Sequence, residues 1–169
     1  MASIHDVSAY ILRRVGPMSP MKLHLLLFYS QAWYLADVGE PLVPDRFEAW
    51  PPGPVAAELF EFHRGVFWLT SWSDGDPDRL TATQRASIDE TVDDYGSFDE
   101  YQIGALVERE DPYWEVRRGL DPVDECHDAI TEDAMLKYYS ALAANEDAGL
   151  VKDYVWTEWN LPVMSSADV

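Results

Sequence analysis

Cys126, His127 and Asp128 are consecutive and carry the side chains of a nucleophilic catalytic centre. In such a centre a histidine takes the proton of a thiol or hydroxyl, and an acid orients the histidine. Side chains of adjacent residues point in different directions, however, so three residues in a row rarely form a working triad. We therefore interpret this segment as a connector and predict no catalytic residue and no enzymatic activity. The alternative is a small hydrolase that uses Cys126 or His63.

A metal site would need several ligands on one face, and His63 with Glu58 and Glu61 comes nearest to one. These spacings scatter the three side chains around a helix instead of stacking them at positions i and i+4. The four histidines form no His-Glu-x-x-His pattern, and one cysteine cannot make a paired-cysteine motif. We expect no metal and no cofactor.

The paired carboxylates do not indicate acid–base catalysis, and the proline-rich turn does not indicate a nucleotide site. Pairs such as Asp93-Asp94 and Glu110-Asp111 are expected in a chain with 31 acidic residues, without any general acid–base role. The turn at 51–54 has few N–H donors for a phosphate, because three of its four residues are prolines. There is no Walker loop or dinucleotide motif.

Charge is distributed unevenly along the chain. The net charge is −19, with 7 acids and 5 bases in residues 1–70 but 24 acids and 7 bases in residues 71–169. A negative field repels nucleic acid and anionic membrane surfaces and attracts basic partners. We therefore predict a protein partner with a basic surface and no nucleic acid or membrane partner. The alternative is an acidic surface that only keeps the chain soluble.

Length and composition favour one folded domain. The chain has 169 residues, of which 47% are hydrophobic, so it can bury a proper core. The single cysteine excludes an internal disulfide and favours a cytoplasmic location. The start lacks the pattern of a signal peptide, and the longest apolar run, 23–35, is too short to cross a bilayer. We assign residues 1–145 to the domain and 146–169 to a partly docked tail.

The elements that must position any site are mostly helices. Ser3 can cap a helix over 4–15, and Ser19-Pro20 begins a second helix that Gly39 ends near residue 38. The second helix is apolar around nearly its whole circumference, which predicts the buried centre of the fold. Residues 42–43 and 47–50 are expected to pair as a β-ribbon.

Pro54 is expected at the first position of a third helix that ends near Arg64. Capping boxes at 81–84 and 97–100 predict two more helices, and Thr131 caps the last long one. With a short helix near 113–118, the prediction is a mainly α fold: about six helices around residues 20–38, with a small antiparallel β-ribbon.

Aromatic and cationic side chains supply the candidate partner contacts, since tryptophan is a frequent hot spot and proline lowers the entropy cost of binding. Trp68 and Trp72, in the loop over 65–78, are the better candidates for exposed aromatic residues; the alternative is a loop that packs down over the core. Two of the candidates have an alternative to partner contact. Lys22 can be a snorkelling side chain with an ion-pair partner, and Trp50 can be a core residue. The candidates are Lys22, Trp50, Pro52, Phe60, Trp68, Trp72 and Trp114.

The segment from Met18 to Phe60 resembles the Panacea domain, the antitoxin domain of SocA-like and phage-associated proteins. The resemblance continues to about residue 142 through Pro112-Tyr113-Trp114, Ile130-Thr131 and Tyr138-Tyr139. Two positions depart from the family pattern, Pro52 before Gly53 and the neighbourhood of Glu108. Within Met18–Phe60, the residues that carry the resemblance are Lys22, Leu23, Tyr29, Ala32, Trp33, Leu42, Glu48, Ala49, Trp50, Gly53, Pro54, Val55 and Leu59.

The resemblance implies an antitoxin of a prokaryotic or phage toxin–antitoxin system that binds and inactivates a toxin encoded beside it. It implies structural roles for Tyr29, Trp33, Gly53, Pro54, Val55 and Pro112. A rival hypothesis is an adaptor that delivers its partner to a protease.

Overall fold

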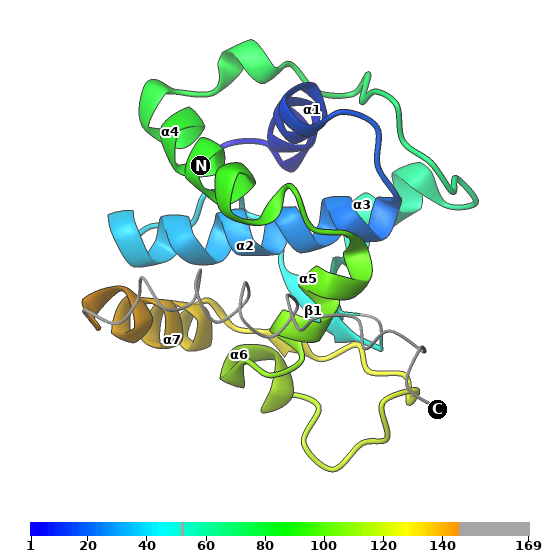
Figure 1. Cartoon of the computed structure of the whole chain (residues 1–169), viewed down its shortest axis with the longest axis vertical. Helices are drawn as coiled ribbons and strands as arrows, with labels where there is room; N and C mark the ends of the chain where they lie inside the picture. The colour runs from blue at the N-terminus through cyan, green and yellow to red at the C-terminus, as the bar shows by residue number, and fades with distance from the viewer. Residues whose placement is uncertain (52, 146–169) are drawn as a thin grey trace, which may run out of the picture.

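A long helix runs through the middle of the fold and the other elements pack around it (Figure 1). The computed structural model describes residues 1–51 and 53–145. The mainly α fold predicted from the sequence is confirmed. In chain order the elements are α1 (Ile4–Val15), α2 (Pro20–Val38), β1 (Phe47–Trp50), β2 (Gly53–Ala56), α3 (Ala57–His63), the 3₁₀ turn η1 (Pro77–Arg79), α4 (Ala82–Tyr95), α5 (Glu100–Val107), α6 (Asp111–Trp114), β3 (Ala129–Ile130) and α7 (Glu132–Ala144).

Helix α2 begins and ends at the predicted signals. The Ser19 hydroxyl accepts a hydrogen bond from the Lys22 N–H, Pro20 occupies the first turn, and Gly39 closes the helix in a left-handed conformation with φ of 78°. Its residues 23–32 are all buried. Helices α1 and α4 cover one side of α2 and α7 covers the other (Figure 1). The predicted buried central helix is therefore confirmed.

Most other helix starts follow local caps. Ser3, Thr81 and Thr131 each accept a hydrogen bond from a backbone N–H of the first turn, and Thr81 forms the predicted capping box with Gln84. The second box is displaced by two residues, because Asp99 with Gln102 caps α5 in place of Ser97. Asp accepts this bond as well as Ser does, so the helix begins at Glu100.

The β-ribbon pairs differently from the prediction. Strand β1 lies between β2 and β3, antiparallel to both, with Phe47 opposite Ala56 and Ile130. Val43 is not in a strand, because the side-chain amide of Gln31 on α2 binds both its N–H and its C=O, at 3.0 and 3.2 Å. A buried side chain thus replaces the expected strand partner.

The third helix begins at Ala57, and not at Pro54 as predicted. Gly53 has a φ of 142°, and the chain reverses there so that Pro54 and Val55 pair with Ala49 and Glu48. Strand β2 is at the edge of the sheet, where a proline without an N–H is tolerated.

Two further elements have other bounds than the sequence predicted. The short helix is Asp111–Trp114 in place of 113–118, and the connector over 124–129 ends in strand β3. The predicted tail and Pro52 lie outside the described residues. Within the described ranges, every helix is too short or too polar to span a bilayer.

Candidate protein-binding surfaces

Tyr29 and Trp33 of α2 are held inside the fold by polar contacts with other helices. The Tyr29 hydroxyl donates to Oε2 of Glu110 at 3.0 Å, and Trp33 Nε1 donates to the Tyr95 hydroxyl at 3.1 Å. The Tyr29 and Tyr95 rings stack with their centroids 4.2 Å apart. These contacts join α2 to α4 and to the turn before α6, and they support a structural role for both residues.

Glu110 is the buried acid of this cluster. It is 8% exposed, and its Oε2 atom also accepts the hydroxyl of Tyr139 on α7. Burial raises the Glu110 pKa to about 7, although the two tyrosine hydrogen bonds act in the opposite direction. The sequence offered only an acidic pair here, which gave no sign that one member closes the junction of α2, α6 and α7.

His24 and His63 form a second buried polar pair. Their Nε2 atoms are 2.7 Å apart, and Nδ1 of His24 accepts the N–H of Ala56 at 3.2 Å. The His24 ring proton therefore lies on Nε2 and is donated to His63. A metal bound by both Nε2 atoms would require His24 to move its proton to Nδ1 and lose the Ala56 bond. The pair therefore connects α2, β2 and α3 as a structural link.

Lys22 and Gly53 both make close contacts at the N-terminal end of α2. Lys22 Nζ donates to the Gly96 carbonyl at 2.7 Å, and burial lowers the Lys22 pKa while Glu100 and Asp99 partly restore it. A Cβ on Gly53 would lie 2.7 Å from Met21 Cε and 3.0 Å from Leu25 Cδ2. The lysine thus makes an internal contact, and the glycine permits close approach of the turn to α2.

The corner around Trp50 is half-buried. Trp50 Nε1 donates to Oε2 of Glu48 at 2.8 Å, and its ring lies 5.1 Å from the Phe60 ring. His127 is within 3.3 Å of the same Glu48 oxygen, while Cys126 is buried. In the described part of the chain no hydrogen bond joins this cysteine to His127, so the three consecutive residues do not assemble as a triad.

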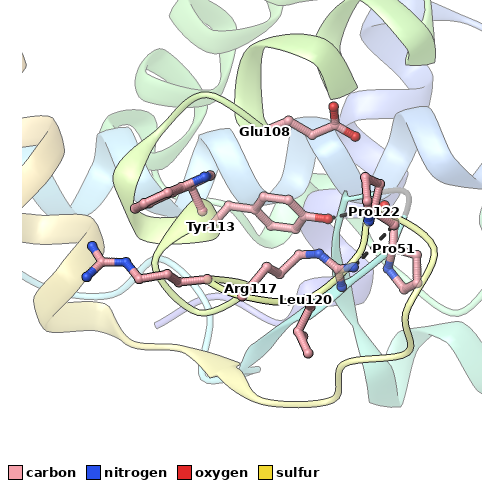
Figure 2. Close-up of a pocket in the computed structure, with 9 residues that line it drawn as sticks. Pro51, Glu108, Tyr113, Arg117, Leu120 and Pro122 are labelled. Atoms are coloured by element: carbon pink, nitrogen blue, oxygen red, sulfur yellow. Dashed lines mark hydrogen bonds between the residues drawn. The ribbon is translucent and has the colours of Figure 1, made fainter.

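A hollow of about 210 Å³ opens beside α6, and we name it the α6 pocket (Figure 2). Trp114 is 47% exposed at its wall, with the Arg118 guanidinium 4.7 Å from its ring centre. The Tyr113 hydroxyl donates to the Trp50 carbonyl, and Pro112 is buried in the first turn. The lining residues are Pro51, Glu108, Tyr113, Trp114, Arg117, Arg118, Gly119, Leu120 and Pro122.

Arg117 holds the far wall of the α6 pocket in place. Its guanidinium is buried and donates to the Ala49 carbonyl at 2.8 Å and to the carbonyls of Asp121, Pro122 and Asp124 at 2.9–3.2 Å. This fork ties the end of β1 to the loop after α6. Figure 2 shows the guanidinium beside Pro122 of that loop. The sequence does not show this role, because all four acceptors are backbone carbonyls.

The loop after α3 presents a second aromatic surface. We name residues 64–68 the aromatic loop; in it Phe67 is 89% and Trp68 60% exposed, and Phe62 at the end of α3 is 59% exposed. Trp72 is only 9% exposed and donates from Nε1 to Nδ1 of His5 at 3.0 Å. The expected exposure therefore holds for Trp68 and is wrong for Trp72, which packs against α1.

The candidates thus divide by position. Trp68 and Trp114 are exposed on different surfaces, Trp50, Phe60 and Lys22 are half-buried, and Trp72 is buried. Pro52 lies outside the described residues. Within those residues, no three His, Cys, Asp or Glu side chains come close enough together to hold a metal ion.

One of three comparisons with known proteins identifies a family. No curated protein and no solved structure matches the chain. The family model described as antitoxin SocA-like, Panacea domain, matches residues 23–115, from the buried face of α2 to the residue after α6. Because this match spans more than half of the 169 residues, the chain belongs to the SocA-like Panacea family of antitoxin domains.

Proposed function

We propose that this protein is an antitoxin that neutralises a cognate toxin by binding it directly. The family match over residues 23–115 carries the proposal. The role needs a surface and no bond-making chemistry. Two exposed aromatic surfaces, the aromatic loop and the α6 pocket, are available for such contacts. The chain would act in the cytoplasm, in line with its single cysteine.

The charge of the chain supports a basic partner surface. The net charge is −19, which disfavours nucleic acid and favours rapid encounter with a positively charged protein. We propose that the acidic second half steers the toxin and that aromatic side chains then anchor it. Occlusion of a basic toxin surface is the mechanism that this combination favours.

A growth assay tests the antitoxin role. The gene beside the one for this chain would be expressed alone and together with it, with an empty vector as the control. We expect the neighbour to stop growth alone and co-expression to restore it. A toxic neighbour that this chain does not rescue, or a harmless neighbour, would contradict the proposal.

A further inference from the structure

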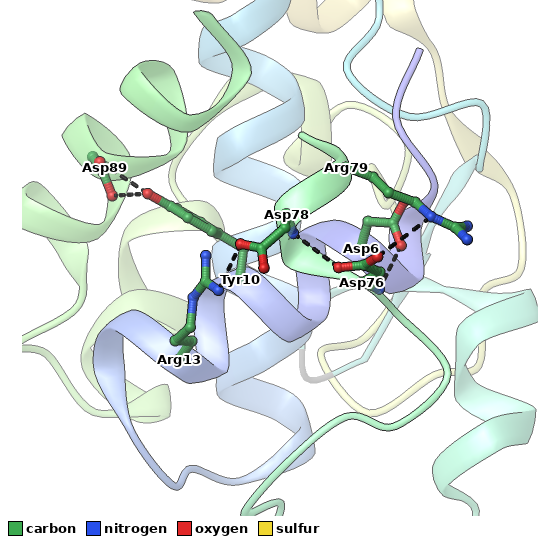
Figure 3. A network of polar contacts seen from close by, with 7 residues as sticks. All are labelled: Asp6, Tyr10, Arg13, Asp76, Asp78, Arg79 and Asp89. Carbon is green, nitrogen blue, oxygen red and sulfur yellow. Dashed lines mark hydrogen bonds and ion pairs between the residues drawn. The ribbon is translucent and has the colours of Figure 1, made fainter. Parts of the chain in front are cut away.

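The segment that follows α3 is fixed at several points to α1 and to the turn between α1 and α2. Leu69 exchanges two backbone hydrogen bonds with Met18, at 3.0 and 2.8 Å. The Asp76 N–H donates to Asp6 Oδ1 at 2.7 Å, and Arg13 pairs with Asp78 at 3.0 Å (Figure 3). The aromatic loop at the start of the segment lies between α3 and the first of these contacts, at Leu69.

Both ends of the aromatic loop are fixed. The Val66 N–H donates to the His63 carbonyl at 2.8 Å on one side, and the Leu69 bridge to Met18 lies on the other. Val66, Phe67 and Trp68 are nevertheless 44%, 89% and 60% exposed. The backbone of the loop is therefore held at both ends, which lowers the entropy cost of ordering the loop on binding.

The aromatic area is large for an isolated loop. At roughly 150–250 Å² for each full aromatic side chain, Phe62, Phe67 and Trp68 together expose on the order of 400 Å². That value is within the range of the largest apolar patch on a typical monomer, and such patches are often functional. It is about half of the roughly 800 Å² that one partner contributes to a standard interface.

A hollow of about 250 Å³ lies directly beside the loop. Its walls combine aromatic rings with hydroxyl groups and one exposed carboxylate: Phe62, Trp68, Thr70, Ser71, Ser73 and Asp74. His63 also lines it, and burial lowers the His63 pKa, so this histidine adds no positive charge at neutral pH. Aromatic faces, oxygen acceptors and a carboxylate together suit a cation on an apolar stem.

A second copy of this chain is a poor occupant. It would bring the same charge of −19 against an acidic hollow, and the aromatic patch alone is too small for a stable dimer. A basic protein has the complementary charge.

We propose that the aromatic loop and the adjoining hollow form the docking site for the toxin. Phe67 and Trp68 anchor an apolar part of the toxin surface, and a lysine or arginine side chain of the toxin enters the hollow. Its stem lies against Trp68 and its charge faces Asp74. This assignment rests on the proposed antitoxin function and specifies which surface performs it.

The test measures binding of the full chain and its variants to the purified product of the adjacent gene. Trp68→Ala is expected to weaken the complex about 30-fold or more, as a hot-spot truncation does. Asp74→Asn is expected to weaken it about 2- to 5-fold, the range for loss of an exposed ion pair. Tyr101→Ala removes an aromatic side chain that is 80% exposed on α5, and Glu40→Gln removes an exposed charge in the turn after α2, outside the acidic second half; both should bind like wild type.

The outcomes separate the two proposals. If wild type neither rescues growth nor binds the neighbour, the antitoxin function fails and the docking site fails with it. If wild type binds and Trp68→Ala binds equally well, only the docking site is wrong. Hydrogen exchange of the complex gives a second readout that needs no variant: residues 66–69 should gain protection, and unchanged exchange there would overturn the assignment.

Discussion

At the scale of single residues, Glu110 places a carboxyl group among tyrosines where water cannot reach it. The group titrates at about 7 in the folded protein, against an ordinary pKa of 4.5. Because the folded pKa is raised, the folded state binds the proton more tightly than the unfolded state does. Glu110 therefore favours folding below about pH 4.5, and this contribution is lost as the pH rises to about 7.

Replacing Glu110 by Gln removes this titration while keeping an oxygen for the Tyr29 and Tyr139 hydroxyls. The difference between pKa values of about 7 and 4.5 corresponds to about 3 kcal/mol. We expect Glu110→Gln to gain about 3 kcal/mol in unfolding free energy relative to wild type between pH 4.5 and pH 8. Urea unfolding across this range measures it. The exposed Glu108→Gln control should run parallel to wild type, and a parallel curve for Glu110→Gln would refute the argument.

The His24–His63 pair has the opposite dependence in the same range. Burial lowers the His24 pKa from 6.5 to about 3, so the unfolded state binds the proton more tightly. The stability is complete above about pH 6.5 and falls as the pH is lowered toward 3. At pH 5 the loss from His24 alone is about 2 kcal/mol.

The variant His24→Asn keeps an oxygen that can accept the Ala56 N–H and has no group that titrates. We expect it to be less stable than wild type at pH 7.5 by about 1–3 kcal/mol, through the lost bond to His63 and the space it leaves. The gap should close by about 2 kcal/mol at pH 5. Unfolding free energies at the two pH values decide this. A gap that stays constant would show that His24 does not resist protonation.

At the scale of elements, the turn from β1 to β2 is fitted against α2 at Gly53. The φ of 142° is outside the range that other residues adopt readily, and the nearest α2 atom lies 2.7 Å from the Cβ position. We expect Gly53→Ala to cost about 2–4 kcal/mol, combining backbone strain with overpacking. Gly65→Ala is the matched control, because Gly65 has a φ of 80° but nothing within 4 Å of its Cβ position.

Thermal or urea unfolding of both glycine variants compares the cost of substitution at a position crowded by α2 with the cost at an open position. Gly65→Ala should lose only the part due to backbone conformation, about 1–2 kcal/mol. Equal losses at the two positions would mean that close packing of the turn on α2 contributes nothing.

Elements specified by neighbouring residues could be predicted, and those specified by distant ones could not. Ser19-Pro20 and Gly39 bound α2 at both ends, since a cap depends on residues within a few positions. The strand pairing depended instead on Gln31, which occupies the backbone groups of Val43 from another element. In the same way, the sequence allows Pro54 to begin a helix or to lie in an edge strand. Pairing with β1 places it in the edge strand β2.

The candidate site shows the same division. Trp68 and Trp72 are four residues apart in one loop, and the sequence does not distinguish them. The two side chains differ in burial because the His5 ring on α1 accepts the Trp72 N–H and holds that side chain against α1. Glu110 was missed for a related reason, since its tyrosine partners come from elements remote in the sequence. Arg117 was missed because its acceptors are backbone carbonyls, which leave no pattern in the sequence.

At the scale of the whole molecule, the charge predicts how binding should depend on salt. With −17 of the net −19 in residues 71–169, the proposed encounter with a basic toxin would be driven by a long-range field. Raising the salt from about 0.05 to 0.5 M should slow association about 10-fold or more, because the Debye length shortens to a few ångströms. Dissociation should change less. Stopped-flow mixing measures both, and an association rate that ignores salt would remove electrostatic steering from the proposal.

Titration of the purified toxin with the purified full-length chain, in a mixture that contains no protease, tests the central claim most directly. Calorimetry would give the affinity and stoichiometry, and the toxin's activity would be followed in the same samples. We predict a tight complex of fixed stoichiometry, with toxin activity lost in proportion to the complex formed. If the chain rescues growth in cells but leaves the purified toxin active, direct neutralisation is wrong.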